Sequence, residues 1–207
     1  MKFDELIDTV AQRVEQELNT SFELEASGRH IHLSREAVDA LFGEGYELTP
    51  KKYLSQPGQY AAAERISVIG PKGVFHNVSI LGPVRNESQV EISFTDARAI
   101  GAKAQLRLSG DTKGTSGIVL MNGSKVYKLD HGLIVAKRHI HVNSQDAEKL
   151  KVKDKEVVKV KVMSDRPLIF DDVVVRISPD FRTFMHIDYD EANACGFVNG
   201  TRGRIIR

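Results

Sequence analysis

The first 20 residues carry apolar side chains at the spacing of one helical face, with acidic, amide and basic residues between them. This pattern predicts an amphipathic helix over residues 1–20. A polar break at residues 19–21 follows and leaves two interpretations open. The helix either packs on its own domain or is a detachable peptide that docks on another protein. The apolar face is formed by Phe3, Leu6, Ile7, Val10, Val14 and Leu18.

From residue 22 onward, apolar and polar residues alternate in short runs that are typical of β-strands. The run over residues 64–83 turns at Gly-Pro-Lys-Gly and predicts a hairpin, and Asn122-Gly123 marks a second hairpin over residues 117–129. The many short strands and few helices favour a mainly β chain built from barrels or sandwiches. Further strands are predicted over residues 89–97, 156–165, 170–178 and 183–192.

Two internal similarities indicate a duplication. The tetrapeptide Arg-His-Ile-His stands at residues 29–32 and again at residues 138–141, and a short helix is predicted after each copy. Ser34 is the expected N-cap of the first helix, and Asn143 or Ser144 that of the second. The chain is therefore interpreted as two related β-rich halves in tandem.

The second similarity aligns the segment EISFTDARAIG, which begins at Glu91, with HIDYDEANACG, which begins at His186. The two segments share an isoleucine, an aromatic residue, two acidic or polar positions, two alanines and a glycine. The alignment sets Glu91 opposite His186, and both residue types bind zinc. It also sets Cys195 opposite Ile100, which indicates a buried structural cysteine.

Each half therefore offers three candidate metal ligands. Residues i and i+2 of a strand point to the same face, so an H-x-H pair can direct two imidazoles at one ion. A single H-x-H would favour two half-buried histidines that are hydrogen-bonded to the backbone, but a copied pair with a matched third residue favours zinc. Three ligands leave one position for water or substrate, as in catalytic zinc sites. The predicted sets are His30, His32 and Glu91 in the first half, and His139, His141 and His186 in the second.

Two stretches look suited to anions. Arg85 precedes Glu91 by six residues, and arginine can hold phosphate through two parallel hydrogen bonds. Arg182 is a candidate counterpart in the second half. Residues 107–117 combine three glycines with several hydroxyl side chains, including Ser109, and either cradle a phosphate-bearing ligand or form an ordinary turn. His76 and His131 lack such neighbours and are interpreted as surface or loop residues.

Composition narrows the function classes. The 29 basic and 28 acidic residues give a net charge of +1 without a basic stripe, so we expect no nucleic-acid partner. The sequence contains no run of 18 apolar residues, so no membrane span is predicted. The acidic first helix does not fit a secretory signal. A single cysteine, Cys195, is compatible with a reducing cytoplasm.

Taken together, the duplicated Arg-His-Ile-His, Gly-Pro-Val-Arg ahead of Glu91, the loop SGDTKGTSG and the final Met-His-Ile-Asp resemble the PduL-type phosphotransacylases. These are the phosphate propanoyltransferases of bacterial propanediol metabolism, and the similarity runs from about Ser27 to Arg207. It implies two tandem β-barrel-like domains with short helices, over residues 28–137 and 138–207, the second completed by residues 21–27. It also implies a two-zinc site between them.

The resemblance implies the reaction of propanoyl-CoA, or acetyl-CoA, with phosphate to give acyl phosphate and CoA. It gives Arg85 the role of binding the attacking phosphate and places Ser109 close to the substrates. Some members carry an N-terminal extension that directs them into a bacterial microcompartment, so the first helix is a candidate for contact with the shell. A homo-oligomer is expected. A dinuclear zinc hydrolase and a non-catalytic, metal-stabilised domain remain the alternatives.

Overall fold

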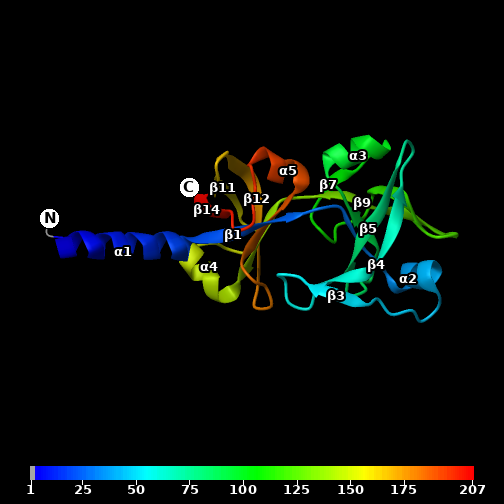
Figure 1. Ribbon diagram of the computed structural model, residues 1–207, viewed down its shortest axis with the longest axis horizontal. Coiled ribbons are helices and arrows are strands. Elements are labelled where there is room, and N and C mark those ends of the chain that lie inside the picture. The colour runs from blue at the N-terminus through cyan, green and yellow to red at the C-terminus, as the bar shows by residue number, and fades with distance from the viewer. Residues whose placement is uncertain (1–2) are drawn as a thin grey trace. The chain divides into compact units, whose positions relative to one another are not determined.

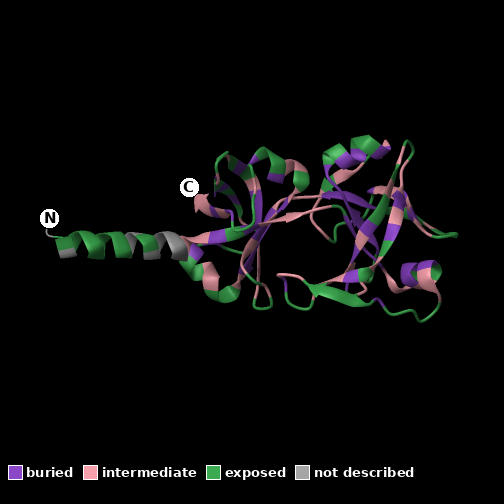
Figure 2. Ribbon diagram, viewed as in Figure 1, coloured by how far each residue is buried: buried purple, intermediate pink, exposed green. Residues whose placement is uncertain are grey.

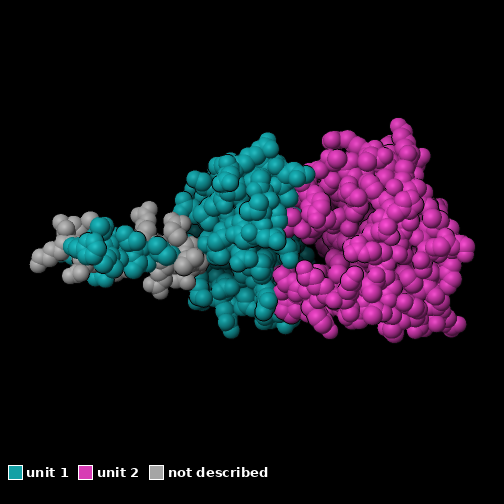
Figure 3. Space-filling model, viewed as in Figure 1, with its two compact units in different colours: residues 1–25, 138–187, 192–207 teal, residues 26–137, 188–191 magenta. Residues whose placement is uncertain are grey.

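The computed structural model describes residues 3–207, except for the side chains of residue 4, residues 12–13 and residues 15–19. In this part of the chain the protein is mainly β, with two closed six-stranded barrels and short helices (Figure 1). It divides into two compact units, which are coloured separately in Figure 3. Unit 1 comprises residues 1–25, 138–187 and 192–207, and unit 2 comprises residues 26–137 and 188–191.

Unit 2 contains one barrel with two additional strands. Its elements are β2 (His30–His32), α2 (Arg35–Phe42), β3 (Pro50–Tyr53), β4 (Tyr60–Ile69), β5 (Val74–Gly82), β6 (Gln89–Glu91), α3 (Phe94–Ile100), β7 (Gln105–Arg107), β8 (Ser116–Asn122) and β9 (Lys125–Ala136). The ring closes in the order β4-β5-β2-β6-β9-β8, and β8 pairs back to β4. Strand β3 adds to β4 and strand β7 adds to β9.

Unit 1 contains the second barrel. Its elements are α1 (Phe3–Thr20), β1 (Ser21–Ser27), β10 (His139–Asn143), α4 (Ser144–Leu150), β11 (Val157–Met163), β12 (Ile169–Ser178), β13 (Phe184–Asp188), α5 (Tyr189–Ala194) and β14 (Arg202–Ile206), of which the last residues of β1 and β13 and the first half of α5 are assigned to unit 2. The ring closes in the order β1-β13-β10-β12-β11-β14. Strand β1 thus completes a barrel whose other five strands come from the second half of the chain.

The two H-x-H strands occupy the same place in their barrels. Strand β2 runs parallel to β5 and antiparallel to β6, and β10 runs parallel to β12 and antiparallel to β13. The register is also the same, because His30 lies opposite Glu91 and His139 lies opposite His186. This shared register supports the alignment of the two halves. The isoleucines between the histidines, Ile31 and Ile140, are fully buried.

Both predicted hairpins are confirmed, as β4–β5 and as β8–β9, whereas two predicted strands are too long. The predictions of strand over residues 89–97 and 183–192 are wrong beyond Glu91 and Asp188, where α3 and α5 begin shortly afterwards. The cause is a reciprocal cap. Ser93 and Asp96 exchange side-chain-to-backbone hydrogen bonds at the start of α3. Asp188 and Glu191 do the same at α5.

The arginine of each Arg-His-Ile-His copy packs on an aromatic ring. The guanidinium of Arg29 lies 4.0 Å from the ring centroid of Phe75, and that of Arg138 lies 5.5 Å from Phe170. Arg29 also holds the carboxylate of Asp96 through two hydrogen bonds of 2.7 and 3.1 Å. The repeated arginine thus anchors the start of each H-x-H strand to a neighbouring strand.

The predicted N-terminal helix is confirmed as α1, although residues 1–2 and the side chain of Leu18 lie outside the described residues. The described apolar side chains of its predicted face are 42–76% exposed, so none of them is buried on unit 1 (Figure 2). Neither α1 nor any other described helix is long and apolar enough to cross a bilayer.

We expect Arg29→Met to lower the free energy of unfolding of unit 2 by about 1–3 kcal/mol, because the part-buried carboxylate of Asp96 loses a charged hydrogen-bond donor. Urea unfolding followed by circular dichroism measures this loss. Arg35→Met is the matched control, since Arg35 pairs with Asp39 and Glu47 at the surface and such pairs are worth about 0–1 kcal/mol. Equal losses in the two variants would contradict the anchoring role of Arg29.

Candidate metal centres

In unit 2, one group of three side chains is arranged around a common point. His30 and His32 extend from the same face of β2, and Glu91 extends from β6. The strand register brings them together, because Glu91 lies directly opposite His30. One ligand atom from each residue lies within 4.8 Å of the others, and all three residues are buried.

Backbone carbonyl groups orient both imidazoles of this group. Nδ1 of His30 is 2.8 Å from the carbonyl oxygen of Gly28, and Nδ1 of His32 is 3.2 Å from that of Leu81. A carbonyl oxygen only accepts, so these contacts place the ring proton on Nδ1. The Nε2 atoms face the third side chain and lie 3.5 and 3.8 Å from Oε1 of Glu91. Both rings are therefore bonded to the backbone and still available to a metal ion.

The charges of the group suit a divalent cation. Burial lowers the pKa of His32 to about 3, with help from the nearby charges of His30 and Arg85, so this ring is neutral at neutral pH. Burial also acts to lower the pKa of His30, but the Glu91 carboxylate raises it above its ordinary value. For Glu91, burial is outweighed by His30, His32 and a hydrogen bond from Ser109, which hold its pKa well below the usual range. The group therefore offers a carboxylate and imidazole nitrogens as ligands.

Both predicted anion-binding residues lie beside this group. The hydroxyl of Ser109 donates a 2.9 Å hydrogen bond to Oε1 of Glu91, and Nη1 of Arg85 is 3.5 Å from the Ser109 oxygen. The backbone N–H of Arg85 donates to the carbonyl of Leu33, one residue beyond β2. The charge of Arg85 is thus held close to the three candidate ligands, and only partly covered.

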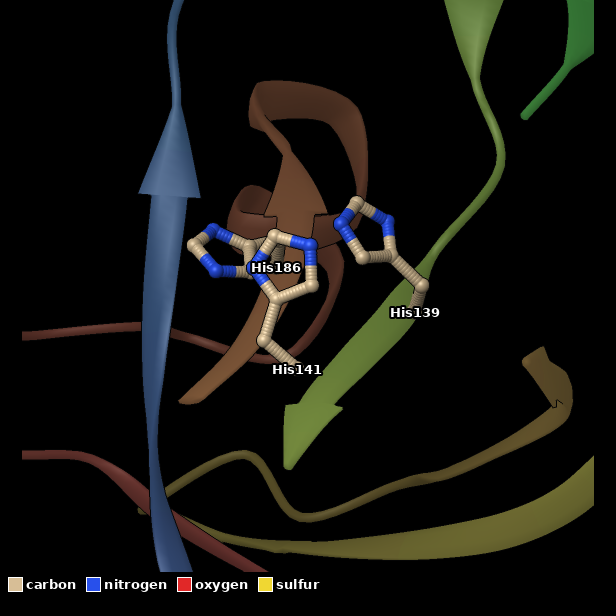
Figure 4. Close-up of side chains that lie close together, drawn as sticks. All are labelled: His139, His141 and His186. Carbon is tan, nitrogen blue, oxygen red and sulfur yellow. The ribbon is translucent and has the colours of Figure 1, made fainter. Parts of the chain in front are cut away.

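Unit 1 contains the second group, which consists of three histidines (Figure 4). His139 and His141 come from β10 and His186 from β13, and their rings point toward one another. The ring centroids are 4.7 Å apart for His139 and His141, 4.7 Å for His141 and His186, and 5.1 Å for His139 and His186. Nδ1 of His186 also lies 3.4 Å from a carboxylate oxygen of Glu25 in β1.

The hydrogen bonding and the charge of His141 show whether this group fits a metal ion. Both of its ring nitrogens are buried and, among the described residues, neither has a hydrogen-bond partner. Burial lowers its pKa to about 3, with further effects from the charges of His139 and Arg176, so the ring is neutral and keeps one lone pair free. Buried polar atoms are normally paired, and a metal ion would provide the missing partner. The donor set therefore fits zinc.

The structure adds two residues to the sites that the sequence analysis did not name. Gln89 is buried beside Glu91, and Arg176 lies next to His141 in the register of β12. Arg176 also lies 5.9 Å from the ring of Phe181, which stacks on His141. The strand alternation of β6 offered a signal for Gln89, because it precedes Glu91 by two residues. Arg182 is the counterpart of Arg85 expected from the sequence, but Arg182 is exposed and the register neighbour of His141 is Arg176.

The other side chains considered from the sequence lie away from these groups. His76 is exposed and bonds to Ser67 at 3.0 Å, and His131 is exposed with its Nε2 3.8 Å from Glu87. Cys195 is fully buried, as expected for a structural cysteine.

Comparison with known proteins gives a consistent result. A family model described as phosphate propanoyltransferase matches residues 23–198. The chain is 61% identical to a phosphate propanoyltransferase of Enterococcus faecalis over 204 residues, which cover 99% of this chain and 97% of the relative. It is 62% identical to one of Listeria monocytogenes over 99% of this chain and 97% of the relative. It is 48% identical to a phosphate propanoyltransferase of Salmonella typhimurium over 94% of this chain and 93% of the relative.

The lowered pKa of His141 makes the metal-free protein sensitive to acid. An unfolded histidine takes up a proton near pH 6.5, whereas His141 in the fold stays neutral down to about pH 3. Between these values the unfolded state binds the extra proton. The stability that His141 contributes is therefore complete above about pH 6.5 and is lost as the pH falls towards 3.

We expect His141→Leu to reduce the pH dependence of unfolding of the metal-free protein by about 1.4 kcal/mol per pH unit between pH 6 and pH 4. Denaturant titrations at several pH values in the presence of a chelator measure the slope. An unchanged slope in the variant would mean that His141 has the same pKa in the folded and the unfolded state.

Proposed function

Because the chain belongs to the phosphate propanoyltransferase family and is thus an acyltransferase, we propose that it transfers the acyl group of propanoyl-CoA to phosphate, reversibly. Acetyl-CoA is the alternative acyl donor, since one methylene changes binding by only about 1–3 kcal/mol. The observation that carries the proposal is the position of Arg85 and Ser109 beside a buried set of metal-binding side chains, in a chain that matches this family over nearly its full length.

Two zinc ions are the proposed cofactors. His30, His32 and Glu91 would hold one, and His139, His141 and His186 would hold the other. When bound, zinc would supply Lewis acidity toward the thioester and stabilise the thiolate that leaves. Three protein ligands in each set leave a coordination position for substrate, whereas structural zinc sites are usually closed by four.

Arg85 is the proposed phosphate-binding residue. Its guanidinium is partly exposed, and a planar fork of N–H donors suits a phosphate with two parallel hydrogen bonds. Bound this way, phosphate would lose part of its charge repulsion toward a thioester carbonyl. Ser109 lies between Arg85 and Glu91 and would contact the substrates through its hydroxyl.

We propose that phosphate attacks the thioester directly while both substrates are bound. The oxygen of phosphate forms the new bond to the acyl carbon, and the sulfur of CoA leaves with the electron pair. Cys195 is fully buried, and the hydroxyl of Ser109 donates to Glu91, so neither side chain is proposed to carry the acyl group. A covalent acyl-enzyme trapped during turnover would overturn this order of events.

The zinc-loaded protein is expected to release free thiol from propanoyl-CoA only when phosphate is present. A thiol reagent measures the release with and without phosphate. Release without phosphate would make the protein a thioester hydrolase. No release in either sample, with both zinc ions bound, would favour a non-catalytic metal domain.

Arg85→Lys serves as the companion variant in that assay. It keeps the positive charge but loses the planar pair of donors, so we expect KM for phosphate to rise about tenfold or more while KM for propanoyl-CoA changes little. Lys103→Arg is a control at an exposed position of unit 2.

For the chain as a whole, we propose residues 28–137 and 138–207 as the two barrel domains, the second completed by residues 21–27, with residues 1–20 as a separate targeting helix. The exposed apolar side chains of α1 support a docking role, and we propose a microcompartment shell inside the cytoplasm as the partner. A homo-oligomer is part of the same proposal.

Residues 1–20 fused to a fluorescent reporter are expected to produce foci in a host that makes microcompartment shells. Val10→Asp with Val14→Asp should abolish the foci, because two charges would interrupt the apolar face. Diffuse fluorescence of the unmodified fusion would count against targeting by α1.

A further inference from the structure

All polar atoms of the Gln89 side chain are engaged, and the side chain is almost fully buried. Its amide nitrogen donates to Oε1 of Glu91 at 2.5 Å and to the hydroxyl oxygen of Ser109 at 2.9 Å. Its amide oxygen accepts a 2.7 Å hydrogen bond from the backbone N–H of Gly110. One side chain therefore joins a candidate metal ligand to the start of the loop between β7 and β8.

These partners allow only one orientation of the amide. The backbone N–H of Gly110 requires an acceptor, and the carboxylate of Glu91 requires donors, so the amide oxygen must face the loop and the nitrogen must face the carboxylate. Oε1 of Glu91 also accepts from Ser109. The rotation of the carboxylate is thus fixed by two donors, and both depend on the position of the loop.

The corresponding position in unit 1 gives a natural comparison. Gln89 lies opposite His32, and Phe184 lies opposite His141 in the same register. In unit 1 the third residue of the group is His186. It has an imidazole instead of a carboxylate, so it needs no amide donor to orient it. The glutamine therefore occurs in the barrel where the third candidate ligand is a carboxylate.

A second glutamine holds the other end of the same loop in the same way. Gln105 donates from its amide nitrogen to the hydroxyl of Ser116 at 3.1 Å and accepts from the Ser116 N–H at 2.9 Å. Each glutamine thus clamps one end of the loop through a serine hydroxyl and a backbone N–H. Of the two, Gln89 is the one that also contacts Glu91.

We propose that Gln89 is a positioning residue that orients the Glu91 carboxylate toward its metal ion and makes zinc affinity at this group dependent on the loop from Ser109. This inference rests on the zinc centre proposed above. Hydrogen-bond partners of metal ligands typically change metal affinity by about 10–100-fold. By linkage, a ligand that moves the loop would change the affinity for zinc, and zinc would change the affinity for that ligand by the same factor.

The test compares Gln89→Met with Gln105→Met in the full chain. Methionine has nearly the length and volume of glutamine but makes none of the amide hydrogen bonds. Zinc dissociation constants are measured by competition with a chelator, and the imidazole NMR signals of His32 and His141 assign each zinc ion to its group. We expect Gln89→Met to weaken zinc binding at the His32 group about 10–100-fold. Its zinc affinity at the His141 group should equal that of the wild type. In Gln105→Met, the zinc affinity of both groups should equal that of the wild type.

Two further readouts separate positioning from loss of loop structure. Hydrogen exchange in the metal-free protein should rise near Ser109 and Gly110 in Gln89→Met and near Ser116 in Gln105→Met, because each variant loses the clamp at one end of the loop. Acyl transfer by Gln89→Met should recover with excess zinc, because the variant lacks metal rather than a reacting group.

Wild-type zinc affinity in Gln89→Met, or an equal loss in Gln105→Met, would overturn the proposal. Wild-type protein that binds no zinc at the His32 group would instead overturn the proposed centre itself. If Gln89→Met does not fold, Gln89→Asn decides by the same criteria, since it keeps the amide but withdraws it by one methylene.

Discussion

Both candidate centres depend on the register between an H-x-H strand and the antiparallel strand beside it. Directly opposed residues in such a pair extend from the same face, about 4.5–5.5 Å apart at Cβ. This places Glu91 beside His30 and His186 beside His139. A slip of one residue would turn the third side chain to the opposite face of the sheet. The fully buried isoleucines between the histidines oppose such a slip, because it would turn them out of the core.

The same constraint explains why the metal groups could be predicted from the sequence. Strand alternation alone sets His30 and His32 on one face, and the second copy of the tetrapeptide predicts the same for His139 and His141. The alignment of Glu91 with His186 then supplied the third member of each group without knowledge of the fold. The hairpins were equally accessible, since glycine-containing turns are local signals.

Contacts between distant segments could not be predicted in this way. The clamp by Gln89 requires β6 and the loop after β7 to meet, and the effect of Arg176 on His141 requires the parallel pairing of β10 and β12. The ends of β6 and β13 were misjudged for a different reason. Their alternating patterns continue into α3 and α5, and only the reciprocal caps at Ser93 and Asp188 stop the strands.

The position of β1 in the second barrel has a consequence for how the chain folds. Strand β1 pairs with β14, so that Ser21 lies opposite Arg204. This barrel cannot close until β14 (Arg202–Ile206) has left the ribosome, whereas the strands of the other barrel all lie between His30 and Ala136. Loop closure over such a distance is slow compared with local pairing. During synthesis, therefore, the barrel with Glu91 can form first, and β1 pairs only after β13 and β14 have been synthesised.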